Sequence, residues 1–211
     1  MDRWVERFLA GPKRVRWDEL PPQIGDAAPN LELRDSTDAL RLLSEFWSDG
    51  PALLLFWRHF GCGCGIDRAS QLHEAYDSYR EAGARVVVVG QGEPERAAAY
   101  AEEYAIECPV LVDPAGSAHD SYGLLEFTLP QVWYKVPYEL FERYRTDPEH
   151  VATVFDERYR ADNRPKVDNP WQQPGEFVVD ADGVLQLTYR YQYCWDFPDD
   201  RVLTTAIREA A

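Results

Sequence analysis

Residues 52–65 read ALLLFWRHFGCGCG, and this stretch decides how the rest of the chain is interpreted. It opens with a continuous apolar run, which is typical of a strand covered on both faces of a sheet. Three glycines then surround Cys62 and Cys64 before a polar stretch with helical periodicity begins. A thiol at the start of a helix meets the positive end of the helix dipole, which favours the thiolate. Arg58 and His59 act in the same direction, so the junction predicts thiol chemistry, although two buried packing residues in a tight turn are the alternative.

The segments after this junction alternate between helix and strand. Apolar spacing predicts a helix over about 66–82, a strand over 86–89, a helix over 93–104 and a strand over 109–112. Such alternation is typical of parallel strands joined by helical crossovers. Near the end, two strand-like runs joined through Asp182-Gly183 predict an antiparallel hairpin, and a last helix is expected over about 199–210.

Two further regions frame this core. Residues 1–23 are predicted to be an N-terminal helical appendage, with Trp4, Phe8 and Leu9 on one face of a short helix. The main domain is expected over 24–211, beginning with a short strand at 31–33 and a helix through Leu40 and Phe46.

An aromatic and charged stretch over about 124–169 interrupts the alternation. Four prolines punctuate it, and we interpret it as an inserted helical lid or interface element. A helix packed on the edge of the sheet is the alternative.

Composition limits the possible functions. The chain has 211 residues, of which 45% are hydrophobic and 13% aromatic, enough for one sizeable core. The net charge of -15 argues against a nucleic-acid partner because phosphates repel an acidic surface. No run approaches the roughly 18 apolar residues of a membrane span, and the N-terminus has no apolar signal core, so a cytoplasmic location is expected.

Four cysteines in a chain of this kind do not form a structural disulfide framework, so each is judged by its context. Cys108 precedes the apolar run 109–112 and is expected in the core. Cys194 lies between Tyr193 and Trp195, where a core role and a role beside the cysteine pair are both open.

Five segments resemble the peroxiredoxin-like branch of the alkyl hydroperoxide reductase and thiol-specific antioxidant superfamily. They are 25–29 (GDAAP), 56–62 (FWRHFGC), 109–114 (PVLVDP), 122–123 (YG) and 171–180 (WQQPGEFVVD). The resemblance implies an α/β thioredoxin-like fold, with a central mixed sheet flanked by helices and the aromatic insertion before the final hairpin.

The resemblance also implies a thiol-dependent oxidoreductase, a peroxidase or disulfide oxidoreductase with an antioxidant role and no cofactor. Cys62 matches the attacking cysteine, and Cys64 or Cys194 is the expected resolving thiol. Pro174 matches the cis-proline that faces the active-site thiol in thioredoxin-fold proteins. The implied partners are a small-molecule peroxide or a protein disulfide, a thiol reductant and a second copy in a homodimer.

Two positions depart from the peroxiredoxin pattern. Peroxiredoxins carry threonine or serine three residues before the attacking cysteine and proline seven before it, whereas this chain has His59 and Leu55. His59 is able to donate a hydrogen bond or act as a base. The branch commonly separates its two cysteines by two residues, but only Gly63 separates Cys62 from Cys64. A disulfide between them therefore needs a non-helical turn.

Two other functions use the same sequence features. Cys62, Cys64 and Cys194 with His59 are a possible ligand set for zinc or an iron-sulfur cluster. Alternatively, the aromatic insertion binds a partner and the protein is a non-catalytic interaction module.

Overall fold

The computed structural model describes residues 3–58, 60, 62–159 and 168–211 of the chain. Its helices are α1 (Arg3–Ala10), α2 (Gly63–Glu81), α3 (Pro94–Glu103), α4 (Ser117–Ser121), α5 (Leu129–Val132), α6 (Tyr138–Thr146), α7 (Pro148–Tyr159) and α8 (Asp200–Ala210), with a short 3₁₀ helix at Leu43–Phe46. Its strands are β1 (Glu32–Asp35), β2 (Leu40–Leu42), β3 (Ala52–Phe56), β4 (Arg85–Gly90), β5 (Val110–Val112), β6 (Gly175–Val179) and β7 (Leu185–Arg190). No helix in these ranges is both long and apolar enough to cross a membrane.

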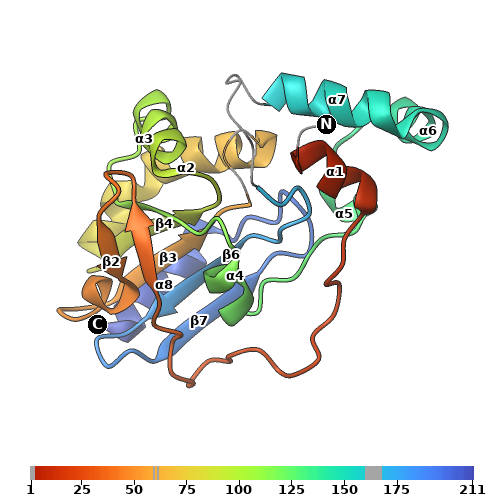
Figure 1. The fold of residues 1–211 in the computed structure, drawn as a ribbon. Coiled ribbons are helices and arrows are strands. Elements are labelled where there is room, and N and C mark those ends of the chain that lie inside the picture. The colour runs from red at the N-terminus through yellow and green to blue at the C-terminus, as the bar shows by residue number, and fades with distance from the viewer. Residues whose placement is uncertain (1–2, 59, 61, 160–167) are drawn as a thin grey trace.

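The strands form one mixed sheet in the order β2-β1-β5-β4-β3-β6-β7 (Figure 1). The central pairs β3/β4 and β4/β5 are parallel, as the alternation of helices and strands predicts. β6 pairs antiparallel with both β3 and β7, so the predicted hairpin is confirmed. Gly183 has a φ of 79°, a conformation that glycine adopts without strain in the turn between β6 and β7. The fold is α/β and thioredoxin-like, as expected.

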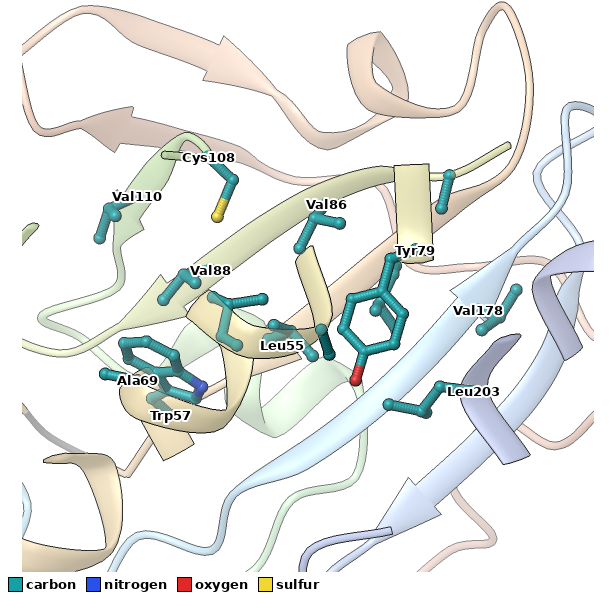
Figure 2. Close-up of a cluster of buried hydrophobic side chains, with 14 of the residues drawn as sticks. Leu55, Trp57, Ala69, Tyr79, Val86, Val88, Cys108, Val110, Val178 and Leu203 are labelled. Carbon is teal, nitrogen blue, oxygen red and sulfur yellow. The ribbon is translucent and has the colours of Figure 1, made fainter. Parts of the chain in front are cut away.

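Alternate residues of the buried strands point to two cores on opposite faces of the sheet. Leu53 and Leu55 of β3 face a core made with α2, α3 and α8, part of which is seen in Figure 2. Leu54 and Phe56 face the other core, which the 3₁₀ helix and α4 cover. Burial on both faces explains why β3 is apolar at every position.

Two predicted elements differ from the structure. The helix expected through Leu40 and Phe46 is wrong, because residues 40–42 form the edge strand β2 and only 43–46 form a short 3₁₀ helix. Pairing of β2 with β1 decides this conformation, and local spacing does not report such pairing. The helix expected from residue 66 begins at Gly63, three residues earlier, so Cys64 lies in its first turn.

The stretch over about 124–169 contains α5, α6 and α7, so its predicted helical character is confirmed. Together with α1 these helices gather at one end of the molecule (Figure 1). Phe8 of α1 stacks on Trp171, with 5.0 Å between ring centroids, and also packs on Trp133 and Tyr144. We call α1, α5, α6, α7 and Trp171 the aromatic cover. The division of the chain at residue 24 stays a prediction.

Candidate active site

Arg58 reaches the cysteine motif from the end of β3. The amide of Trp57 still pairs with the carbonyl of Val89 at 2.8 Å, and the chain leaves the sheet directly afterwards. The Arg58 side chain is buried, with 6% exposure. Its Nη1 donates a hydrogen bond to Cys62 Sγ at 2.8 Å, and its Nη2 donates to the carbonyl of Pro170. The cation is therefore held from two sides and directed at one thiol.

Cys62 is the residue that caps the N-terminus of α2. Its backbone is extended, with φ −75° and ψ 139°, and its carbonyl accepts the first helical hydrogen bond from Ile66. Cys64 lies in the first turn of the helix, and 2.7 Å separates the two Sγ atoms, which are not joined in a disulfide. Cys62 itself lies outside the helix, so only Gly63 and Cys64 of the pair have helical backbone.

Cys194 approaches the pair from the loop between β7 and α8. The loop is fixed by a hydrogen bond from the Cys194 amide to the Gln131 carbonyl at 3.0 Å, and by another from Trp195 Nε1 to Asp67 of α2 at 2.7 Å. Cys194 is only 1% exposed and belongs to the same buried cluster as Cys62 and Cys64. The structure thus brings together three thiols from two distant parts of the chain.

The protonation of this cluster is uneven. Burial acts to lower the pKa of Arg58, but the nearby Cys194, Cys62 and Cys64 outweigh it, and the pKa of the guanidinium is raised. Hydrogen bonds to Cys194 and Cys62, together with burial, hold the pKa of Cys64 well above its ordinary value. The pKa of Cys194 is raised to about 12, mainly because the thiol is buried. A negative charge in the cluster therefore falls on Cys62, beside Arg58.

Pro174 lies on the same small cavity as Cys64 and Cys194. Phe56 pairs with Gly175 across β3 and β6, so the residue before β6 lies next to the end of β3. The cavity has a volume of about 10 Å³, and its lining includes Arg58, Cys64, Pro174 and Cys194. Such a space has room for about one water molecule. The three thiols are at most 6% exposed, so they are shielded from solvent in the reduced protein.

The cis-proline that the resemblance implies is absent. The peptide bond that precedes Pro174 is trans. The position of Pro174 at the cavity nevertheless follows from the register of β6 on β3, which does not depend on the isomer of that bond.

A buried ionic network borders the thiols, and the sequence reasoning missed it. Arg68 of α2 pairs with Glu176 of β6, with 2.8 Å between Nε and Oε1, and both side chains are at most 2% exposed. Tyr191 donates a hydrogen bond to Glu176, while Tyr79 donates one to Asp200. Glu176 is an acidic residue inside an apolar strand, and that break in the pattern was the available signal. Arg68 and Tyr191 also line the thiol cavity, so the network forms its inner wall.

The remaining sequence predictions concern Cys108, His59 and a metal site. Cys108 is buried in the core on the α2 face of the sheet, as expected, and is not part of the thiol cluster (Figure 2). His59, which was expected to assist Cys62, lies outside the described residues. Among the described residues, no group of three or more histidine, cysteine, aspartate or glutamate side chains is arranged to hold a metal ion.

Comparison with known proteins identifies relatives of the chain. Residues 24–188 match the model of the AhpC/TSA family. The thioredoxin-like protein AAED1, chloroplastic, of Arabidopsis thaliana is 31% identical over 129 residues, which are 54% of this chain and 51% of the plant protein. The match thus spans about half the length of this curated relative.

Solved structures show the same fold. Peroxidoxin BcpB from Mycobacterium tuberculosis superposes with a TM-score of 0.63 at 18% identity, over 90% of this chain and 99% of that one. A thiol peroxidase from Chromobacterium violaceum superposes with a TM-score of 0.59 at 17% identity, over 90% and 88% of the two chains. At these identities the likeness concerns the arrangement of the sheet and its helices.

Proposed function

Because the chain belongs to the AhpC/TSA family, we propose that it is a thiol-dependent oxidoreductase in which Cys62 is the nucleophile. The observation that carries the proposal is the hydrogen bond from the buried Arg58 guanidinium to Cys62 Sγ at 2.8 Å. A positive charge next to a thiol at a helix N-terminus stabilises the thiolate, which is the reactive form.

The first step is attack of the Cys62 thiolate on one oxygen of a hydroperoxide. A sulfur-oxygen bond forms and the oxygen-oxygen bond breaks, so Cys62 becomes a sulfenic acid and the leaving oxygen departs as an alcohol or water after protonation. Arg58 supports this step in two ways. Its positive charge stabilises the thiolate before the attack, and it stabilises the negative charge that develops on the peroxide oxygens during the attack.

The second step returns the sulfenic acid to a stable form. The Cys64 thiol attacks Cys62 Sγ, a disulfide forms and water leaves. With 2.7 Å between the two sulfur atoms in the reduced protein, Cys64 is placed to react before a second peroxide arrives. Two external thiols, or one dithiol, then reduce the disulfide and are themselves oxidised to a disulfide.

A small hydroperoxide is the substrate that best suits the enclosed site. Arg58 Nε and Trp57 Nε1 are buried without a hydrogen-bond partner among the described residues, and both residues line the thiol cavity. Two unsatisfied donors favour a ligand with oxygen acceptors. Cys62 is only 6% exposed, which disfavours direct attack on a disulfide carried by a folded protein.

These donors also bear on the two departures from the peroxiredoxin pattern. Leu55 lies inside β3 and packs in the core, so its side chain does not take part in binding a substrate. We propose that Arg58 and Trp57 position the peroxide in place of the missing hydroxyl side chain. The metal-binding alternative has no supporting observation in the described residues.

Peroxide consumption by the full chain, with dithiothreitol as the reductant, tests this function. We expect Cys62→Ser to abolish the protein-dependent consumption of hydrogen peroxide. Cys108→Ala is the matched control, since Cys108 is an equally buried thiol in a separate core, and it should retain the activity. Consumption by Cys62→Ser at the rate of the unmodified protein would contradict the proposal.

Three finer expectations belong to the same proposal. The cytoplasmic location and the homodimer follow from the sequence and the resemblance, and sedimentation of the purified protein tests the dimer. The natural reductant is expected to be a small thiol or a dithiol protein, which a comparison of glutathione with a thioredoxin in the consumption assay distinguishes.

A further inference from the structure

The three thiols of the site are not equivalent, because only one of them is hydrogen-bonded to the cation. Arg58 Nη1 donates to Cys62, and no such bond from Arg58 to Cys64 or Cys194 occurs among the described residues. The positive end of α2 also favours an anion on Cys62, which caps the helix. The site is therefore built to hold a thiolate at one sulfur.

A disulfide that includes Cys62 removes this arrangement. Sγ of Cys62 then carries no negative charge, and the buried Arg58 guanidinium loses its hydrogen-bonded anion and keeps only its charge interaction with Cys194. Loss of a charge-assisted hydrogen bond from a buried cation is costly. The oxidised form with a bond between Cys62 and Cys64 is thus electrostatically worse than one in which Cys62 is a thiolate.

Cys194 supplies the alternative partner. It lines the same small cavity as Cys64, and a hydrogen bond joins the two thiols, which raises the pKa of Cys64 and lowers that of Cys194. The bond from Trp195 to Asp67 holds the loop of Cys194 on α2, three residues after Cys64. Two sulfur atoms from different segments are thus fixed side by side.

The order of acidity allows Cys194 to react. In the reduced protein burial is the main cause that raises the pKa of Cys194 to about 12, and a hydrogen bond with Cys62 also raises it, while a hydrogen bond with Cys64 and the charge of Arg58 lower it. When Cys62 and Cys64 are joined in a disulfide, neither sulfur carries a proton or a charge, and Cys194 is the thiol of the cluster that is left to ionise beside Arg58. A leaving thiolate of low basicity departs fastest, and Cys62 beside Arg58 is that thiolate.

We propose that the disulfide moves from Cys62 to the pair Cys64 and Cys194 within the same protein molecule. The Cys194 thiolate attacks Cys64 Sγ, the bond between Cys64 and Cys62 breaks, and Cys62 leaves as a thiolate beside Arg58. No electrons are gained or lost, since one disulfide and one thiolate are exchanged for another disulfide and another thiolate. If Cys194 instead resolves the sulfenic acid first, attack by Cys64 on Cys194 Sγ leads to the same product.

This inference rests on the proposed function and assigns Cys194 a role as the third redox thiol. Its consequence is that the oxidised protein keeps a free, reactive Cys62. The disulfide then joins Cys64 and Cys194, and Cys62 is again a thiolate before the external reductant acts.

Disulfide mapping of the full chain tests the exchange. Cleavage after arginine places Cys62 and Cys64 in one peptide, residues 59–68, and Cys194 in another, residues 191–201. After one equivalent of hydrogen peroxide, and in parallel after diamide, free thiols are blocked with iodoacetamide before digestion. We expect the two peptides to be crosslinked through Cys64, with Cys62 alkylated.

Variants make the result specific. Cys194→Ala should give an intrapeptide disulfide between Cys62 and Cys64, with Cys62 at least tenfold less alkylated than in the oxidised wild-type chain. Cys108→Ala should behave as the wild type does. A wild-type disulfide between Cys62 and Cys64, or between Cys62 and Cys194, would overturn the exchange.

The parallel oxidants separate this inference from the proposed function. If peroxide leaves all thiols free while diamide produces the crosslink through Cys64, the peroxidase function fails and the exchange stands. If peroxide oxidises the protein but Cys62 remains in the disulfide, the function stands and the exchange fails.

Discussion

Arg58 Nη1 lies 2.8 Å from Cys62 Sγ in a part of the protein where both residues are only 6% exposed. The cation comes from the end of a central strand and the thiol from the cap of the following helix. Arg58 and Cys62 are four positions apart in the sequence, so the fold places a permanent positive charge beside the nucleophile in a buried site. In such a setting the charge acts more strongly than it does at the surface.

Replacement of Arg58 should slow the chemistry at Cys62. Removal of one donor that stabilises developing negative charge typically costs about 10²-fold in rate, and we expect a loss of that order for Arg58→Met. Arg58→Lys should recover only part of the rate, because an ammonium does not contact Cys62 and Pro170 with a planar fork. The rate of hydrogen peroxide consumption, with dithiothreitol as the reductant, checks both variants. Arg80→Met, at an exposed position on α2, is the control, and an unchanged rate in Arg58→Met would refute the role of the cation.

Loss of the Glu176 charge should destabilise the fold. Glu176→Gln removes the carboxylate that is hydrogen-bonded to the buried Arg68 and leaves it only Asp200, 4.0 Å from its Nη1. Breaking a buried ion pair from one side costs about 3–5 kcal/mol. Asp49→Asn breaks the exposed pair of Asp49 with Arg85 and should cost about 0–1 kcal/mol. Urea denaturation of the reduced proteins gives both values, and equal losses in the two variants would speak against a structural role for the network.

Alkaline pH should reveal the buried thiol of Cys108. Burial raises its pKa from 9.0 to about 12, so the folded state keeps a proton that the unfolded state loses. Its stabilising effect is complete below pH 9 and is lost progressively as the pH rises from 9 to about 12. Over that range the free energy of unfolding of the wild type should fall more steeply than that of Cys108→Ala, by about 1.4 kcal/mol per pH unit. Parallel pH slopes for the two proteins in denaturant titrations would contradict the prediction.

Disruption of the aromatic cover should expose the thiols. Phe8 is 2% exposed and stacks on Trp171, whose neighbour Pro170 accepts a hydrogen bond from Arg58. Phe8→Ala should destabilise the protein by about 3–5 kcal/mol and raise the alkylation rates of Cys64 and Cys194 under native conditions. Val202→Ala, at a 46% exposed position of α8, serves as the control. If the thiols react no faster in Phe8→Ala, the cover does not restrict access to them.

Local sequence patterns were sufficient to predict much of the secondary structure. The apolar run at β3, the helical spacing of α2 and α3 and the Asp182-Gly183 turn each reflect backbone preferences that act over a few residues. The helix expected through Leu40 failed for the opposite reason. Residues 40–42 extend along the edge of the sheet because β1 offers them hydrogen bonds, and that partner is remote from their own side-chain pattern.

The sequence by itself determined the family resemblance, the place of Cys62 and Cys64 at the head of a helix and the nearby positive charge of Arg58. Only the tertiary structure decided that Cys194 joins them, that Glu176 meets Arg68 beneath them and that α1 helps to cover them. The physical reason is sequence separation. Charge and helix caps act between neighbours along the chain, whereas burial and contacts between distant segments exist only once the sheet and its loops are assembled.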